Sequence, residues 1–220
     1  MVHKNKQKFH IPFIIISLIA AISLAVNFFL VKERKNYNQV TEVVDGDTFQ
    51  LKSGKRVRLM GIDAPEFDRC GGSQAKDRLT ELIMGKNVIL KEETEKAFGR
   101  SLSLVYYGGS FINKIMLEEG WGRTDYRKNT QRDVLTSAFH EAQVNKAGIF
   151  SPLCRLTGER PKGDCLIKGN IGQATYEKFY HLPGCRHYDE VVLDMDRGEV
   201  YFCTEEEAQS FGFRKASSCP

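Results

Sequence analysis

The sequence predicts a mostly β fold with flanking helices (α+β), in which a five-stranded barrel carries about three helices on its side. Short β-prone runs and turn signals at Asp-Gly and Ser-Gly give three strands within residues 39–62, with two more expected at 88–90 and 102–106. Three other stretches repeat apolar residues with a helical period. Five strands enclosing a small barrel make an OB-like fold, and a sandwich of short strands is the alternative.

Helix ends are marked by capping residues. Ser73 is expected to cap a helix that runs to about Met84. A second helix is expected at residues 111–119, and a third is expected to begin at Thr130 and to end before Gly148. Their buried stripes are expected to be Ala75, Leu79, Leu82 and Ile83, then Ile112, Ile115, Met116 and Leu117, then Leu135, Phe139, Ala142 and Val144.

The chain divides into four segments by composition. Residues 1–35 hold a basic flank and an apolar run, and residues 36–154 hold the predicted barrel. A Gly- and Pro-containing linker is expected at 155–163, followed by a small Cys-rich α+β module at 164–220. Within this module a strand is expected at Tyr201-Phe202, and a helix between Thr204 and Gly212.

The apolar run at residues 11–31 contains no charged side chain. About 20 apolar residues suffice for a helix to cross a bilayer. The run is longer than the 7–15 apolar residues of a typical signal peptide. It therefore predicts a retained single-pass anchor, with cleavage near Ser23-Leu24-Ala25 as the alternative, which would make the protein secreted. Basic residues flank both ends of the run, so the orientation signal is weak.

The net charge of +4 is unevenly distributed. Residues 1–35 carry +5, residues 36–154 carry +1, and residues 155–220 carry −2. The positive excess therefore lies beside the apolar run, which excludes a broadly basic nucleic-acid-binding surface. Affinity for a phosphate backbone would have to come from individual arginines.

Six cysteines predict disulfides in an oxidising compartment, outside the cytoplasm. Partition by segment pairs Cys70 with Cys154 across the barrel domain. Four cysteines remain in the tail, where small size makes disulfides valuable. The pairs favoured there are Cys165–Cys203 and Cys185–Cys219, and a Zn²⁺ site of His181, Cys185, Cys203 and Cys219 is the alternative.

A carboxylate cluster interrupts the strands of the barrel. Asp45 and Asp47 flank one turn, and Asp63 and Glu66 flank the bend at Pro65. Turns at strand ends can bring such acids to one hard cation, which prefers carboxylate and carbonyl oxygens. Each acid taken alone is more typical of a solvated strand end, so only the combination indicates a site.

These residues resemble the staphylococcal nuclease (thermonuclease) family over about residues 37–152. The family pattern Asp-Gly-Asp-Thr begins at Asp45 and is followed by Arg58-Leu59 and Asp63-Ala64-Pro65-Glu66. Its Tyr-Gly-Arg triplet is similar to Phe98-Gly99-Arg100 here, and Ala64 stands where Thr is more common. The resemblance implies an OB-like fold and a nuclease that uses one Ca²⁺ and leaves 3′-phosphates. It also implies three catalytic residues, which are Arg58, Glu66 and Arg100.

Phosphodiester hydrolysis needs charge neutralisation, an activated water and stabilisation of the leaving oxygen. In this interpretation Asp47, Asp63 and the Ala64 carbonyl bind Ca²⁺, and Asp45 orients its waters. Glu66 orients or deprotonates the attacking water. The guanidinium groups that hold the phosphate oxygens are those of Arg58 and Arg100.

Tyr126 and Trp121 are the candidates for stacking a nucleobase, although Trp121 suits a core position equally well. The expected protein is therefore a monomeric, membrane-anchored nuclease that faces outward and cleaves DNA or RNA with little base specificity. The alternatives are an inactive OB-like module that binds nucleic acid or a peptide, and an adaptor that acts through residues 164–220.

Overall fold

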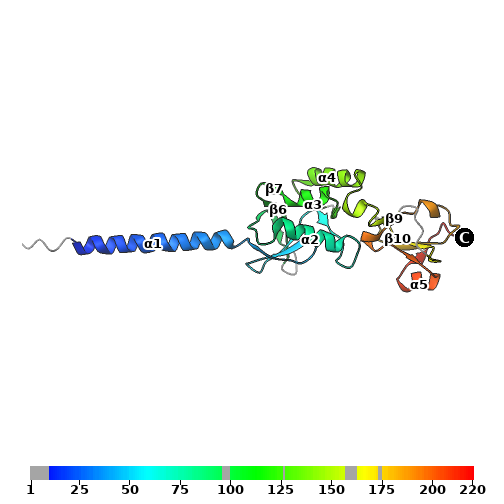
Figure 1. Cartoon of the computed structure of the whole chain (residues 1–220), viewed down its shortest axis with the longest axis horizontal. Helices are drawn as coiled ribbons and strands as arrows, with labels where there is room; N and C mark the ends of the chain where they lie inside the picture. The colour runs from blue at the N-terminus through cyan, green and yellow to red at the C-terminus, as the bar shows by residue number, and fades with distance from the viewer. Residues whose placement is uncertain (1–9, 96–99, 126, 157–162, 173–174) are drawn as a thin grey trace, which may run out of the picture.

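The computed structural model describes residues 10–95, 100–125, 127–156, 163–172 and 175–220. Figure 1 shows three parts in a row, with helix α1 at one end, a central unit of sheet and helices, and a C-terminal module at the other end. The change of composition near Arg155 predicted a division of the chain at that point.

Helix α1 (His10–Asn36) contains the apolar run, and its described side chains at 15–28 are exposed. The expectation of a helix here is confirmed. In the part of the chain that the structure describes, however, no helix combines the length and the apolar character needed to cross a membrane. The predicted span at residues 11–31 is therefore not supported.

One sheet organises the central unit, in the order β1-β2-β3-β6-β5, with β7 added to β6. Strands β3 and β6 run parallel and the other pairs are antiparallel. The strand predictions at 39–62, 88–90 and 102–106 are confirmed. The strands are β1 (Val40–Val43), β2 (Thr48–Leu51), β3 (Arg56–Leu59), β5 (Ile89–Glu95), β6 (Arg100–Tyr107) and β7 (Ser110–Phe111).

The edge strands β1 and β5 approach each other without forming a continuous ladder in the described residues. A single bridge joins Gln39 to Asn87, and Val40 and Gly85 add hydrogen bonds beside it. The left-handed backbone of Gly85 turns the chain out of α2, so only a few residues run beside β1 before β5 begins. The fold class α+β is confirmed, whereas closure into a barrel is not found.

Three helices cover this sheet, as expected, and are α2 (Gly72–Ile83), α3 (Ile112–Glu118) and α4 (Arg132–Val144). Their caps differ from expectation. Gly71, in a left-handed conformation, precedes α2, and Ser73 lies inside the helix, where its hydroxyl donates to Gln74. Thr130 contacts Glu92 and does not cap α4. Val144 is 80% exposed, so it is not part of the buried stripe.

A buried amide joins α3 to the sheet. Asn113 is fully buried, and its Nδ2 donates to the carbonyls of Met60 (2.9 Å) and Ser103 (3.3 Å). Its Oδ1 accepts from the backbone N–H of Val105 at 2.8 Å. Because a buried amide without partners would be costly, this network fixes α3 against the end of β3.

The C-terminal module has its own small core around Tyr180, Phe202 and Phe213. Thr204 caps α5 (Glu205–Ser210) through a hydrogen bond from the Glu207 N–H, as expected. The sheet order is β13-β10-β11-β14, and a separate ribbon pairs β9 with β12. These strands are β9 (Arg155–Leu156), β10 (Ile167–Ile171), β11 (Lys178–His181), β12 (Leu193–Asp194), β13 (Val200–Phe202) and β14 (Arg214–Lys215).

The cysteines are joined as Cys70–Cys154, Cys165–Cys203 and Cys185–Cys219. These are the pairs favoured from the sequence, and no described cysteine is free. The zinc alternative loses its three thiolates to these bonds. His181, its fourth candidate ligand, makes a hydrogen bond with Asn170 at 3.1 Å.

Removing the disulfide between the loop before α2 and the end of the central unit should lower stability substantially. Cys70 and Cys154 are separated by 84 residues, and closing so long a loop constrains the unfolded chain strongly. We expect a Cys70→Ala/Cys154→Ala variant to lose about 2–4 kcal/mol of unfolding free energy in urea denaturation. The Cys185→Ala/Cys219→Ala variant is the comparison for a shorter loop. A wild-type midpoint in the first variant would contradict the prediction.

Candidate metal and phosphate site

The turn between β1 and β2 carries Asp45 and Asp47. Asp45 Oδ1 accepts from the Asp47 N–H at 3.0 Å, which fixes the turn locally. Gly46 is required by packing, because a Cβ there would lie 2.6 Å from the Cβ of Ala75 and 2.8 Å from that of Ala64. The Asp-Gly signal therefore marks a close approach between this turn, helix α2 and the loop after Asp63.

Asp47 is only 2% exposed, and its carboxylate accepts hydrogen bonds from several sides. Its Oδ1 accepts from the Thr48 hydroxyl at 2.7 Å. Its Oδ2 accepts from the Ala64 N–H at 3.1 Å and lies 2.7 Å from Arg58 Nη2. The buried acid is thereby held in one orientation, at the edge of the loop that carries Asp63.

Arg58 joins the two acids that were predicted to share a cation. The same Nη2 atom lies 2.7 Å from Asp47 Oδ2 and 2.6 Å from Asp63 Oδ1. The two carboxylate oxygens are therefore at most 5.3 Å apart. The Asp63 side chain is 67% exposed, and Arg58 Nε is buried without a hydrogen-bond partner. A positive charge thus already lies between the two carboxylates.

Burial raises the pKa of Asp47 to about 7, and the nearby charge of Asp45 acts in the same direction. The guanidinium of Arg58 opposes this shift, as do the hydrogen bonds from Thr48 and Ala64. Near neutral pH the acid is therefore poised between its two charge states. An added cation would favour the ionised form.

The segment that bears Asp63 and Glu66 is shaped by backbone contacts. Strand β4 (Ile62–Asp63) pairs with β8 (Arg123–Thr124), with Asp63 opposite Arg123. The Glu66 carbonyl then accepts from the Arg69 N–H at 2.9 Å. A Cβ at Gly72 would overlap that carbonyl, so the start of α2 requires glycine. The side chain of Glu66 itself faces solvent.

Arg100 is exposed at the start of β6, opposite Arg56 in the parallel register with β3. Arg56 and Arg58 lie two residues apart on β3 and therefore share a face. Arg100 thus lies on the strand next to Arg58 and on the same face of the sheet. Phe98 and Gly99 of its triplet lie outside the described residues. Two acids of the neighbouring strand β5 are paired elsewhere, Glu92 with Thr130 and Glu93 with Lys55.

The structure thus brings Asp47, Arg58, Asp63 and the backbone of Ala64 into direct contact. In the described part of the chain, no three His, Cys, Asp or Glu side chains are close enough together to form a metal site. Two carboxylates and a backbone carbonyl nevertheless suit a calcium ion, which is satisfied by oxygen ligands and water. Their oxygen ligands fit Ca²⁺, and binding of the ion requires the Arg58 guanidinium to move from between the two acids.

The predicted base-stacking residues are placed unequally. Trp121 is half-buried and packs against the main core, and Tyr126 lies outside the described residues. An aromatic residue that was not predicted is Phe67, which follows Glu66 and is 63% exposed. Lys76 Nζ lies 5.5 Å from the centre of its ring. The sequence signal that could have identified Phe67 is its position directly after Glu66, in a bend that contains Pro65.

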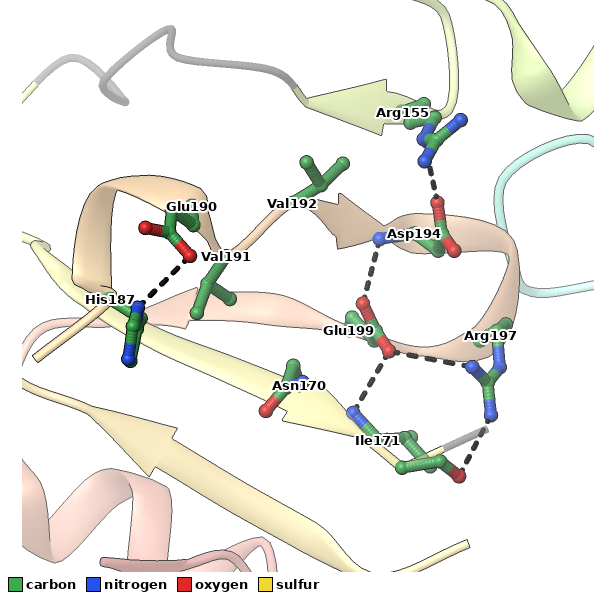
Figure 2. Close-up of a pocket in the computed structure, with 11 residues that line it drawn as sticks. Arg155, Asn170, Ile171, His187, Glu190, Val191, Val192, Asp194, Arg197 and Glu199 are labelled. Carbon is green, nitrogen blue, oxygen red and sulfur yellow. Dashed lines mark hydrogen bonds and ion pairs between the residues drawn. The ribbon is translucent and has the colours of Figure 1, made fainter. Parts of the chain in front are cut away.

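The C-terminal module contains a separate polar cavity of about 430 Å³ (Figure 2). Its charged groups are occupied with one another, since Arg155 pairs with Asp194 at 3.3 Å and His187 lies 3.0 Å from Glu190. Glu199 accepts hydrogen bonds from two backbone N–H groups. Most charged groups of the cavity are therefore paired with one another, although Arg155 Nε and Asp194 Oδ1 are buried without a hydrogen-bond partner, and the cavity is the weaker candidate.

Comparison with known proteins identifies relatives of the central unit. The family model of the staphylococcal nuclease homologues matches residues 56–152. A micrococcal nuclease from Shigella flexneri is 34% identical over 127 residues, which cover 51% of this chain and 72% of the relative. A protein named uncharacterized endonuclease from Haemophilus influenzae is 32% identical over 121 residues (53% and 67%). A staphylococcal-like nuclease from Arabidopsis thaliana is 30% identical over 155 residues (64% and 47%).

Proposed function

The chain belongs to the staphylococcal nuclease family, and on that premise we propose that it is a Ca²⁺-dependent nuclease that hydrolyses DNA or RNA. The observation that carries this function is the contact of one cationic atom with both Asp47 and Asp63. Two carboxylates this close repel each other unless a cation lies between them. The pair is therefore suited to a divalent ion.

Asp47, Asp63 and the Ala64 carbonyl would hold the ion, with Asp45 orienting the waters around it. When bound, Ca²⁺ would neutralise charge on the phosphate and polarise a phosphoryl oxygen. With only two carboxylate ligands, several positions around the ion would remain for water and substrate. Asp47 lies in the turn before β2, Asp63 and Ala64 lie at the end of β4, and Gly46 allows the two segments to pack closely.

Arg58 and Arg100 are the proposed phosphate ligands. Arg58 has one buried Nε without a partner, and its other contacts are with the acids of the metal site. A guanidinium displaced from those acids by a metal ion would be free to pair with a phosphate oxygen. Arg100, exposed on the neighbouring strand, can add a second fork from the same face of the sheet.

Glu66 is the proposed general base or water-orienting group. Its side chain is exposed beside the metal-binding residues, while its backbone is fixed by Arg69 and Gly72. Phe67 and Trp121, with Tyr126, are candidates for base stacking, which is tolerant of sequence. We therefore propose little base specificity.

A nuclease assay on the full chain tests this function. Linear and circular DNA and an RNA are incubated with Ca²⁺, Mn²⁺ or Mg²⁺, with and without a calcium chelator. Cleavage that depends on Ca²⁺ is expected, and the circular substrate distinguishes endonuclease from exonuclease activity. Binding without hydrolysis under all three metals would instead support an inactive nucleic-acid-binding module.

Calcium affinity should depend on pH through Asp47. Because burial raises the pKa of Asp47 to about 7, calcium must displace a proton at lower pH. We expect the Ca²⁺ concentration for half-maximal binding to rise about tenfold per pH unit below 7 and to level off above it. Calorimetric titration from pH 5 to pH 8 measures this. A flat profile across that range would contradict the prediction.

In the ion-free protein, the raised pKa of Asp47 makes folding stability fall with rising pH, whereas calcium affinity rises. The folded chain holds the Asp47 proton more tightly than the unfolded chain, whose acid titrates near 3.8. The contribution of Asp47 to stability is therefore complete below that pH and is lost as the pH rises through about 7.

We also propose a location outside the cytoplasm and a monomeric state. Three disulfides support an oxidising compartment, because cytosolic proteins rarely keep them. The membrane anchor predicted at residues 11–31 is not supported by the described part of helix α1. Fractionation of cells and protease treatment of intact cells test the location and the anchor together, and light scattering tests the oligomeric state.

A further inference from the structure

The C-terminal module contacts strand β8, which pairs with Asp63, through a half-buried arginine. Arg123 lies opposite Asp63 in the β4–β8 ribbon, so its backbone supports that acid directly. Its side chain reaches the module, where Nε lies 2.7 Å from Asp196 Oδ2 and Nη2 lies 3.0 Å from Asp196 Oδ1. The Nη2 atom also lies 3.1 Å from Asp194 Oδ2. One guanidinium thus holds two acids of another domain.

The two acids are buried, and the side chain of Arg123 is 21% exposed. Asp196 is 4% exposed and Asp194 is 8% exposed. The Arg123 guanidinium lies 5.2 Å from the centre of the Phe150 ring, which covers one of its faces. Buried, bidentate pairs of this kind are geometrically specific and are sensitive to the loss of either partner.

Hydrogen bonds within the module hold the loop at residues 194–199, which carries Asp194 and Asp196; Figure 2 shows several of them. Glu199 accepts from the N–H groups of Asp194 and Ile171, each at 2.8 Å. Arg197 donates to the Gly172 carbonyl at 3.2 Å, and Arg155 lies 3.3 Å from Asp194. The loop at residues 194–199 is therefore held to strand β10 of the module, and its two acids restrain the position of the Arg123 side chain.

A second contact links the module to Cys70, at the C-terminal end of the segment at residues 63–70 that carries Asp63 and Glu66. Cys154 is fully buried and is bonded to Cys70, four residues after Glu66. The Met195 N–H donates to the Cys154 carbonyl at 2.9 Å. The same module loop therefore contacts both the strand beside Asp63 and the disulfide that anchors the end of the segment.

We propose that the C-terminal module braces the calcium-binding segment at residues 63–70, with Arg123 and Asp196 as positioning residues for Asp63. This inference rests on the proposed nuclease function. Strand β4 is only two residues long, and the largely exposed side chain of Asp63 is held by Arg58, the group that calcium would displace. When the ion binds, the pairing of β4 with β8 is therefore a support that remains for this ligand. Removal of a residue that orients a metal ligand without touching the ion itself commonly lowers metal affinity 10–100-fold.

The test compares Asp196→Asn with a matched control in the full chain. Asp196→Asn replaces a charged bidentate partner with a side chain of nearly the same shape. The control is Glu119→Gln, which weakens the bidentate contact of Arg78 with Glu119 between α2 and the end of α3, where both distances are 2.6 Å. For each protein, Tm is measured against the concentration of Ca²⁺ alone, and kcat and KM are then measured at saturating Ca²⁺.

We expect Asp196→Asn to raise the Ca²⁺ concentration of half-maximal Tm increase at least tenfold, and Glu119→Gln to change it less than twofold. Saturating Ca²⁺ should restore most of kcat in Asp196→Asn, because the acids and arginines of the site are intact. If Asp196→Asn does not fold, the milder Asp194→Asn is measured in the same way; it alters the 3.1 Å contact with Arg123 and the 3.3 Å contact with Arg155.

Wild-type calcium dependence in the variants, even with a lowered Tm, would overturn the brace and leave the proposed function standing. If neither the Tm nor the hydrolysis rate of the wild-type chain changed with Ca²⁺ concentration, the proposed function and the brace would both be overturned. The two failures are therefore distinguished by the wild-type titration.

Discussion

Glu66→Gln should lower kcat about 10³-fold while leaving Tm within a few degrees of the wild type. Glutamine keeps the size of the side chain but cannot accept a proton from the attacking water. The folding cost should be small, because the Glu66 side chain is exposed and the loop is fixed by its backbone and by Gly72. Single-turnover hydrolysis at saturating Ca²⁺ and substrate measures the loss.

Asp68→Asn is the matched control for Glu66→Gln. Asp68 is an exposed acid in the same bend, two residues further along the chain. Its neutralisation should leave kcat within about twofold, because the residue has no proposed role in the reaction. If both variants lost activity equally, the effect would reflect the charge of the loop and not a specific base. Full activity in Glu66→Gln would remove Glu66 from the mechanism.

Asp47→Asn should abolish the rise of Tm with Ca²⁺ and lower hydrolysis at least 100-fold. The buried carboxylate is the ligand that the ion-free protein keeps in place, through Thr48 and Ala64. Without its charge, the site retains one exposed carboxylate and a carbonyl, too few for a useful affinity. A scan of Tm against Ca²⁺ concentration, with activity measured in parallel, tests this.

The ion-free stability of Asp47→Asn provides the control for misfolding. Burial of the ionised acid is costly, as its raised pKa indicates, so a neutral amide of the same shape should leave Tm unchanged or slightly higher at pH 8. A variant that is stable yet insensitive to Ca²⁺ would assign the loss to metal binding. A variant that still responds to Ca²⁺ would move the metal site away from Asp47.

The sequence predicted the strands of the central unit and the acids at their ends because both depend on local patterns. Asp45, Gly46 and Asp47 form a turn by short-range hydrogen bonds, and Pro65 ends a strand by its own chemistry. The Cys70–Cys154 disulfide followed from the division of the chain into two units, which also confined the other four cysteines to the tail without fixing how they pair. These features need little knowledge of distant contacts.

The features that the sequence could not supply depend on contacts between distant segments. The cap of α2 is Gly71, not Ser73, because the following Gly72 must pack on the Glu66 carbonyl. That requirement is invisible to a rule based on side-chain caps. The bridging position of Arg58 likewise depends on two turns meeting, and the contact between Arg123 and Asp196 spans 73 residues.

The most direct test of the central claim is a crystal structure of the protein with Ca²⁺ and a nucleotide that mimics the cleaved strand. We predict one ion bound by Asp47, Asp63 and the Ala64 carbonyl, with Arg58 turned from the two acids to the phosphate. If Arg58 Nη2 still bridged Asp47 and Asp63, and calcium lay elsewhere or was absent, the proposed site would be wrong.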